Sequence, residues 1–138
     1  MNCWSENSQA VYDTLCTELQ TLVMYVLRFY DCSLLCGYRP EVAQNSAYAS
    51  GHSDKQWPDS RHNTEPSEAV DMAAYLRDVD TYDKRECLSF SAYVLGCADT
   101  LYQHGLMSRR VRCGNGLGDD ERTDRTPFDW DLCHLELI

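Results

Sequence analysis

A histidine and an aspartate stand nine positions apart near the middle of the chain, with a Pro-Ser turn between them. These residues are His62 and Asp71, and the C-terminal segment adds a second histidine, His134. Two imidazoles and one carboxylate can hold a zinc ion and leave one coordination position for water, the ligand count of a catalytic zinc site. Asp131, three residues before His134, is placed to accept a proton from that water. The spacing alone leaves open a simpler interpretation, in which His62 is a surface-loop histidine and Asp71 caps a strand.

A single domain over residues 1–138 is the expected organisation, because this length is common for one domain with one hydrophobic core. The formal net charge of −10 argues against a nucleic-acid partner, which needs a concentrated basic surface. No apolar run is long enough for a transmembrane helix, and the N-terminus lacks the basic and apolar regions of a secretory signal. We therefore expect a chain that is made in the cytoplasm, and we also expect it to be a monomer.

Eight cysteines raise the question of disulfides or cysteine-bound metal: Cys3, Cys16, Cys32, Cys36, Cys87, Cys97, Cys113 and Cys133. None of them forms a Cys-x-x-Cys pair, which removes the usual signatures of structural zinc and of redox chemistry. A chain without a signal peptide folds where thiols stay reduced, so we expect free thiols that pack as small hydrophobic side chains. Cys133 adjoins His134, and it is the thiol that we expect to respond to a bound metal.

Hydrophobic periodicity and turn residues predict the order of secondary structure. The expected elements are helix 8–29, strand 31–36, helix 40–50, loop 51–67, strand 69–73, helix 83–103, strand 109–113, loop 114–127 and strand 135–138. Pro40 suits the start of the second helix, and Gly51 and Gly105 suit helix ends. Short strands mixed with helices predict an α+β domain, with a small, mostly antiparallel sheet flanked by helices.

The C-terminal motif places a geometric condition on the site. Residues three apart in a strand point to opposite faces. Asp131 and His134 can therefore meet one ion only if the residues between them form a turn that leads His134 into the last strand. From His134 onward, alternation places Glu136 on the same face, where it can orient a metal ligand. A solvent-facing glutamate is the alternative for that position.

Several short motifs follow one another along the chain: Gly37-Tyr38-Arg39-Pro40, Gln44, Ser60-Arg61-His62, Pro66-Ser67-x-Ala69-Val70-Asp71 and Asp131-x-x-His134-x-Glu136-Leu137. As a set they resemble the zinc peptidases of the D-Ala-D-Ala carboxypeptidase group, and in particular phage endolysins of the L-alanyl-D-glutamate peptidase type. The resemblance runs from about residue 9 to the C-terminus. It implies a zinc metallopeptidase that cuts the peptide stem of bacterial peptidoglycan.

The resemblance also implies a role for each matching residue. His62, Asp71 and His134 correspond to the zinc ligands, and Asp131 corresponds to the general base. Arg39 corresponds to an active-site arginine that stabilises developing negative charge. Such an arginine makes independent chemical sense, because attack on an amide builds an oxyanion that a planar fork of donors can meet. The alternative for Arg39 is a surface salt bridge.

The chain departs from the family pattern at several positions. The spacing from His62 to Asp71 is nine where many members have seven. Cys113 and Gly116-Leu117 stand where the family often has an aromatic residue and an Asp-Trp pair, and Cys133 replaces a proline or small residue. The acidic residues Asp119, Asp120, Glu121 and Asp124 lack the spacing of a calcium loop, so we expect a solvated acidic loop. These departures bear on substrate fit more than on metal binding.

Three hypotheses follow from the sequence. The first is a zinc-dependent phage lysis enzyme that waits in the host cytoplasm and then cuts L-alanyl-D-glutamate or D-Ala-D-Ala bonds in the cell wall. The second is a catalytically impaired domain on the same scaffold that binds zinc or the cell wall. The third is a cysteine-rich metal-storage or redox protein, which the absence of paired cysteines disfavours.

Overall fold

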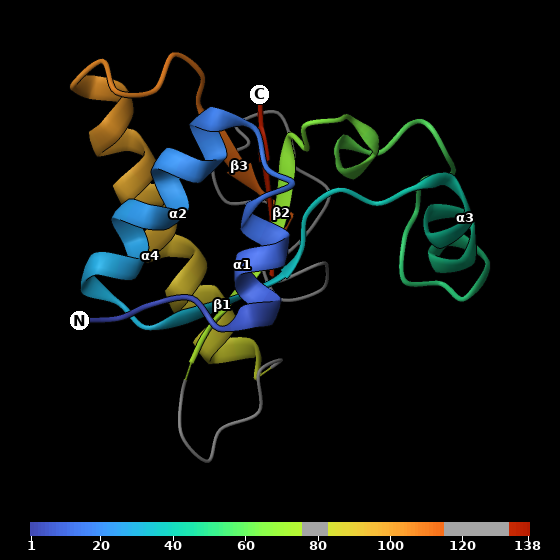
Figure 1. Cartoon of the computed structure of the whole chain (residues 1–138), viewed down its shortest axis with the longest axis horizontal. Helices are drawn as coiled ribbons and strands as arrows, with labels where there is room; N and C mark the ends of the chain where they lie inside the picture. The colour runs from blue at the N-terminus through green and yellow to red at the C-terminus, as the bar shows by residue number, and fades with distance from the viewer. Residues whose placement is uncertain (76–82, 115–132) are drawn as a thin grey trace.

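The computed structural model describes residues 1–75, 83–114 and 133–138, and Figure 1 shows their arrangement. The described helices are α1 (Glu6–Tyr12), α2 (Thr17–Phe29), α3 (Glu41–Ala49) and α4 (Lys84–Gln103), with a short 3-10 helix, η1 (Arg61–Asn63). The described strands are β1 (Cys32–Cys36), β2 (Ala69–Ala74), β3 (Val111–Cys113) and β4 (His134–Leu137). None of the described helices is long and apolar enough to cross a membrane.

The four strands form one sheet in the order β1-β2-β4-β3, and every neighbouring pair is antiparallel. One face of the sheet carries buried aliphatic side chains: Leu34, Val70, Met72, Val111, Leu135 and Leu137. Helices α2 and α4 pack against each other, and α4 contacts β2 and β3 (Figure 1). The predicted α+β class, with a small antiparallel sheet flanked by helices, is confirmed.

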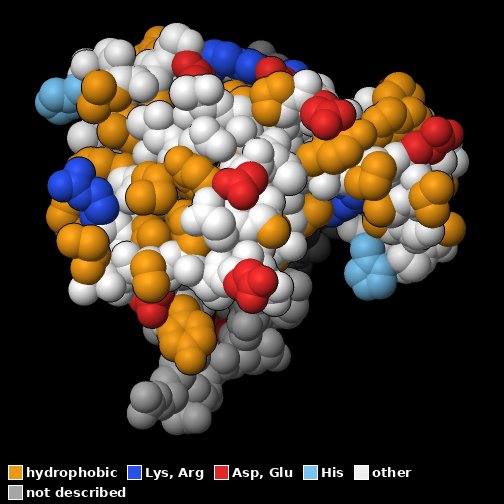
Figure 2. All heavy atoms as spheres, in the orientation of Figure 1, with side chains coloured by type: hydrophobic (Ala, Val, Ile, Leu, Met, Phe, Trp, Pro, Cys, Tyr) orange, Lys and Arg blue, Asp and Glu red, His pale blue; other side chains and the backbone are white. Residues whose placement is uncertain are grey.

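The apolar stripe of α2 supplies much of the core between helix and sheet. Its buried residues recur at helical spacing: Leu19, Leu22, Val23, Val26 and Leu27. Each buried aliphatic side chain contributes about 1.5–3 kcal/mol relative to exposure, so this stripe fixes how α2 lies on the rest of the core. On the face drawn in Figure 2, acidic side chains are scattered among hydrophobic ones, and the described residues form no broad basic surface on this face.

The expected single helix over residues 8–29 is wrong, because α1 ends at Tyr12 and α2 begins at Thr17. Between them the backbone pairs with the segment before β2. The Cys16 N–H donates to the Ser67 carbonyl at 2.9 Å, and the Ser67 N–H donates to the Thr14 carbonyl at 2.8 Å. Leu15, within the break, remains buried in the core, so the apolar pattern continues where the helix does not. Periodicity alone does not reveal such a long-range backbone pairing.

The segment between β1 and β2 holds α3 and the predicted loop over residues 51–67. Pro40 is the N-cap residue of α3, and Gly51 follows its C-terminal end with a left-handed φ of 79°. The loop also contains η1, which the sequence analysis did not predict. Reciprocal hydrogen bonds between Ser60 and Asn63 hold this turn, including Ser60 N–H to Asn63 Oδ1 at 3.0 Å. The turn matters because it carries His62.

Gly37 follows β1 and lies against the break between α1 and α2. A Cβ at this position would collide with Thr14 Oγ1 and lie 3.0 Å from Leu15 Cδ2. We predict that Gly37→Ala lowers the free energy of unfolding by about 1–3 kcal/mol, the usual cost of overpacking. Gly96→Ala is the matched control, because Gly96 lies within α4 with open space around it. That control should gain about 1 kcal/mol from helix propensity. Urea unfolding measures both, and similar shifts in the two variants would contradict the prediction.

Glu68 joins the start of β2 to two arginines. Its carboxylate accepts from Arg109 at 2.6 Å and from Arg61 at 3.0 Å. The hydrogen bond from Arg109 is the largest of several contributions that lower the pKa of Glu68 below its ordinary value of 4.5. A carboxylate with a lowered pKa contributes stability that is present above that value and is lost as pH falls through the folded-state pKa.

We predict that Glu68→Gln lowers the free energy of unfolding by about 1 kcal/mol at neutral pH, with the difference from the parent vanishing in strong acid. Asp99→Asn is the control, because the Asp99–Arg110 pair is exposed and should contribute little. Denaturant unfolding at a series of pH values from neutral to acidic measures both. A deficit of Glu68→Gln that stays constant across this range would show that the ion pairs are not its cause.

Candidate metal and catalytic site

Asp71 lies at the centre of the candidate site because of the register of three strands. It lies opposite His134 in the pairing of β2 with β4, and opposite Cys36 in the pairing of β1 with β2. Side chains directly opposite each other in antiparallel strands project from the same face. The three residues therefore share the face of the sheet that points away from the aliphatic core.

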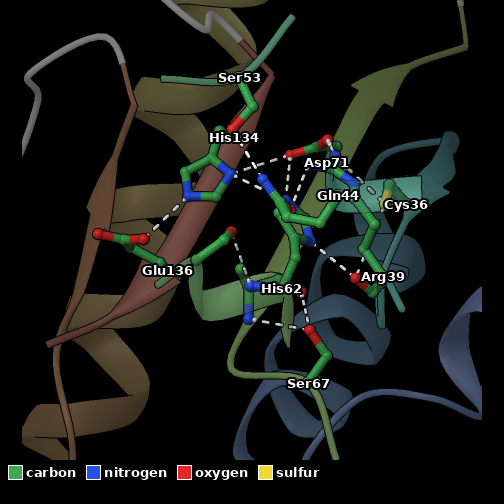
Figure 3. Close-up of polar contacts among 12 residues, drawn as sticks. Cys36, Arg39, Gln44, Ser53, His62, Ser67, Asp71, His134 and Glu136 are labelled. Atoms are coloured by element: carbon green, nitrogen blue, oxygen red, sulfur yellow. Dashed lines mark hydrogen bonds and ion pairs between the residues drawn. The ribbon is translucent and has the colours of Figure 1, made fainter. Parts of the chain in front are cut away.

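His62 reaches the same point from η1. Its Nε2 lies 3.1 Å from Asp71 Oδ1 and 3.1 Å from His134 Nδ1. The third side of this triangle, between His134 Nδ1 and Asp71 Oδ1, measures 3.0 Å. Figure 3 shows the three side chains pointing toward one another from separate segments of the chain. The structure thus brings together the three residues that the sequence analysis selected as metal ligands.

The outer ring nitrogens of both histidines have their own partners. His62 Nδ1 lies 2.7 Å from the Gly37 carbonyl oxygen, and His134 Nε2 lies 3.1 Å from Glu136 Oε2. Arg112 in turn donates to Glu136 Oε1 through Nε at 2.7 Å. The expected placement of Glu136 on the His134 face is confirmed. Partners of this kind orient the rings of metal-binding histidines.

The spacing of the donor atoms suits a metal ion. Ligand atoms about 2.1 Å from a tetrahedral zinc ion lie roughly 3.4 Å from one another. The separations of 3.0–3.1 Å among His62, Asp71 and His134 are therefore within a few tenths of an ångström of that arrangement. Donor atoms of Cys36, His62 and Asp71 also lie within 4.8 Å of one another. This group of side chains can hold a metal ion.

Close contact strongly perturbs the titration of the clustered groups. Burial raises the pKa of Asp71, but hydrogen bonds from His134 and His62 outweigh burial and hold that pKa far below its ordinary value. Burial lowers the pKa of His62, but hydrogen bonds and charges from Asp71 and Cys36 raise it to about 10. Burial also opposes ionisation of Glu136, yet His134 and Arg112 lower its pKa to about 2. The site therefore stabilises positive charge between its carboxylates.

Arg39 lies at the edge of this cluster and is only 18% exposed. Its NH2 is 3.6 Å from Asp71 Oδ2, and its NH1 donates to Gln44 Oε1 at 3.1 Å. Gln44 is fully buried and also donates through Nε2 to Ser53 Oγ at 2.9 Å. Arg39 does form an ion pair, but its partner is Asp71 within the site and the pair is mostly buried, unlike the exposed surface pair of the alternative interpretation. Gln44 belongs to the motif set but had no predicted role, and the structure shows that it orients Arg39.

A small polar pocket of about 90 Å³ opens over these residues. Arg39, His62, Asp71, His134 and Glu136 are among the described residues that line it. Lys55 and Arg112 also line it, so cationic and anionic groups face the same space. A pocket of this composition suits a charged or strongly polar ligand.

Some of the predicted residues cannot be placed. The proposed general base, Asp131, lies outside the described residues, as do Gly116-Leu117 and the expected acidic loop at 119–124. All eight cysteines lie within the described residues, and none of them forms a disulfide there.

The cysteine that lies among the candidate ligands is Cys36, which the sequence analysis treated as part of a buried strand. Cys133, the expected metal-responsive thiol, packs with Ala73 and Cys87, with its Sγ 3.5 Å from that of Cys87. Burial raises the pKa of Cys36, but hydrogen bonding to His62 and the positive charges of His62 and Arg39 leave it below its ordinary value.

No protein-family profile matches the chain, and no curated protein matches it. Its fold is similar to the crystal structure of the Serratia marcescens L-Ala D-Glu endopeptidase ChiX, with a TM-score of 0.70. The similarity covers 98% of this chain and 89% of that one, at 19% sequence identity. At this identity the match shows a shared fold, and it supports the architecture that the motif resemblance implied.

We predict that His62→Ala and His134→Ala each abolish stoichiometric binding of one divalent transition-metal ion, because each removes one of three converging donors. The folded core should survive, since it is built from aliphatic side chains on the other face of the sheet. His104→Ala is the matched control, because His104 is exposed at the end of α4. Metal analysis after dialysis measures the effect. One tightly held ion in both site variants would refute the assignment of the donors.

Proposed function

We propose that the protein is a zinc-dependent peptidase that cuts the peptide stem of bacterial peptidoglycan. The convergence of His62, Asp71 and His134 within 3.0–3.1 Å of one another is the observation that carries this proposal. Two imidazole nitrogens and one carboxylate form a ligand set of catalytic zinc sites. The motif resemblance points to the same chemistry, and the fold is similar to that of an L-Ala D-Glu endopeptidase.

A bound zinc ion would polarise the scissile carbonyl and lower the pKa of a coordinated water. The chain's own residues supply the remaining requirements of the reaction. His62 and His134 are held in orientation by the Gly37 carbonyl and by Glu136. Arg39, anchored by Gln44, presents a guanidinium at the edge of the site. There it can stabilise the oxyanion that forms when water attacks an amide.

Proton transfer is assigned to Asp131. Glu136 is the other acidic candidate, but it is bound by Arg112 and His134, and its pKa of about 2 makes it a weak base. Its contacts suit a positioning role instead. Asp131 retains the role that the motif resemblance gives it, three positions before a ligand.

The pocket contains cations that can bind the carboxylates of a peptide substrate, although Asp54, Asp71 and Glu136 line it as well. Arg39, Lys55 and Arg112 line it, and peptidoglycan stems carry carboxylates that such cations attract. Of the two bonds considered, L-alanyl-D-glutamate and D-Ala-D-Ala, the similar fold of an L-Ala D-Glu endopeptidase favours the first. We further propose that the protein is a monomeric phage lysis protein, which accumulates in the host cytoplasm and reaches the cell wall at lysis.

One observation favours a second candidate function. Cys36 lies close enough to His62 and Asp71 to share their ion, and a site closed by four protein ligands is typical of structural metal centres. The alternative is thus a catalytically impaired domain that binds zinc or the cell wall. Release of new amino termini from purified peptidoglycan by the zinc-loaded protein separates the two functions. Binding to the wall without release would favour the alternative.

We predict that Asp131→Asn keeps stoichiometric zinc but lowers the rate of peptidoglycan hydrolysis by about a hundredfold or more, the usual scale for a general base. Asp99→Asn is the control, since Asp99 lies in an exposed ion pair with Arg110. Initial rates of amino-terminus release and zinc content are measured on the same samples. A rate near that of the parent would assign proton transfer to another group.

A further inference from the structure

Cys36 reaches the site face of the sheet through an irregularity in β1. Strict alternation would place it on the same face as Leu34, which points into the core. The pairing with β2 shifts register between these two residues, so that Leu34 lies opposite Met72 and Cys36 lies opposite Asp71. A bulge of this kind re-aims the side chains that follow it. Cys36 therefore projects on the same side as the candidate ligands.

The thiol lies among several groups that bind or balance a cation. Its Sγ, a ring nitrogen of His62 and a carboxylate oxygen of Asp71 all lie within 4.8 Å of one another. Arg39 NH2 lies 3.5 Å from the same sulfur, and Figure 3 shows Cys36 beside Asp71 and Arg39. Sulfur, nitrogen and oxygen donors together form a set that zinc and other transition metals accept.

These residues do not have the arrangement of a Cys-His-Asp nucleophilic triad. In a triad the carboxylate binds one ring nitrogen of the histidine and the nucleophile binds the other. Asp71 lies at Nε2 of His62, and Nδ1 is engaged by the Gly37 carbonyl at 2.7 Å. Cys36 is therefore not opposite Asp71 across the ring. In contrast, one shared cation can be coordinated by Cys36, His62 and Asp71 in the positions that these side chains occupy.

We propose that the Cys36 thiolate is a fourth protein ligand of the ion held by His62, Asp71 and His134. The inference rests on the proposed function, because it concerns the same ion at the same site. The thiol proton passes to solvent as the sulfur–metal bond forms. The resting site is then closed by sulfur, and hydrolysis requires water or substrate oxygen to displace it.

Cobalt(II) alone is the probe that tests this ligand. The metal-free parent protein is titrated with cobalt, and its absorption spectrum is recorded. Visible d–d bands of tetrahedral cobalt report occupation of the site, and an intense sulfur-to-cobalt charge-transfer band in the near ultraviolet reports thiolate ligation. We expect both in the parent. Cys36→Ala should keep the visible bands, lose the charge-transfer band and bind cobalt at least about tenfold more weakly.

Cys16→Ala is the matched control, because Cys16 is half-buried like Cys36 but lies at the start of α2. It should keep both sets of bands. Visible bands without the charge-transfer band in the parent would overturn ligation by Cys36 while leaving the three-residue site intact. No cobalt binding by the parent would overturn the proposed metal site as well.

A second measurement on the parent does not depend on whether a variant folds. Iodoacetamide labelling of each cysteine is mapped by peptide mass spectrometry with and without cobalt. Ligation predicts that cobalt slows labelling of Cys36 at least about tenfold and leaves that of exposed Cys3 unchanged. Equal labelling of Cys36 in the two samples, with the visible cobalt bands present, would overturn the proposal.

Discussion

The site depends on the register of β2, because that strand places Asp71 between a residue of β1 and a residue of β4. Val70 and Met72, which flank Asp71, are almost completely buried on the other face of the sheet. A slip of one residue would turn both of them toward the pocket and Asp71 into the aliphatic core. The hydrophobic effect therefore fixes the position of the carboxylate, although no aliphatic side chain takes part in the chemistry.

A buried polar network holds the other half of the site against the sheet. Asn63 donates through Nδ2 to the Arg39 carbonyl at 3.0 Å and to Gln44 Oε1 at 3.0 Å. The Arg39 N–H donates to the His62 carbonyl at 2.7 Å. A buried polar group left without a partner costs about 1–3 kcal/mol, so these contacts favour one arrangement of η1 and the turn after β1. His62 and Arg39 are thus positioned by the same network.

The sequence was most informative about the candidate site, where short motifs contain the residues that carry the chemistry. The motif resemblance, more than the spacing alone, predicted that His62, Asp71 and His134 converge, and alternation along the last strand predicted the place of Glu136. It was least informative where distant backbone segments meet. The break between α1 and α2 follows from pairing of Cys16 with Ser67, and the position of Cys36 follows from a bulge. Neither leaves a periodic signal, because each depends on a partner strand or segment far along the chain.

The balance of charge around Asp71 bears on whether the Cys36 thiol binds the ion. Asp71 is an anion that is held between two imidazoles and the guanidinium of Arg39. A divalent ion placed at this point displaces protons from its ligands and brings more positive charge than one carboxylate can balance. A thiolate at Cys36 supplies a second negative charge and lies next to Arg39. Glu136 contributes less to this balance, because Arg112 already neutralises it. The positive charge of a bound dication favours a thiolate ligand, and the bulge in β1 places the Cys36 sulfur on the side of the sheet where such a ligand is needed.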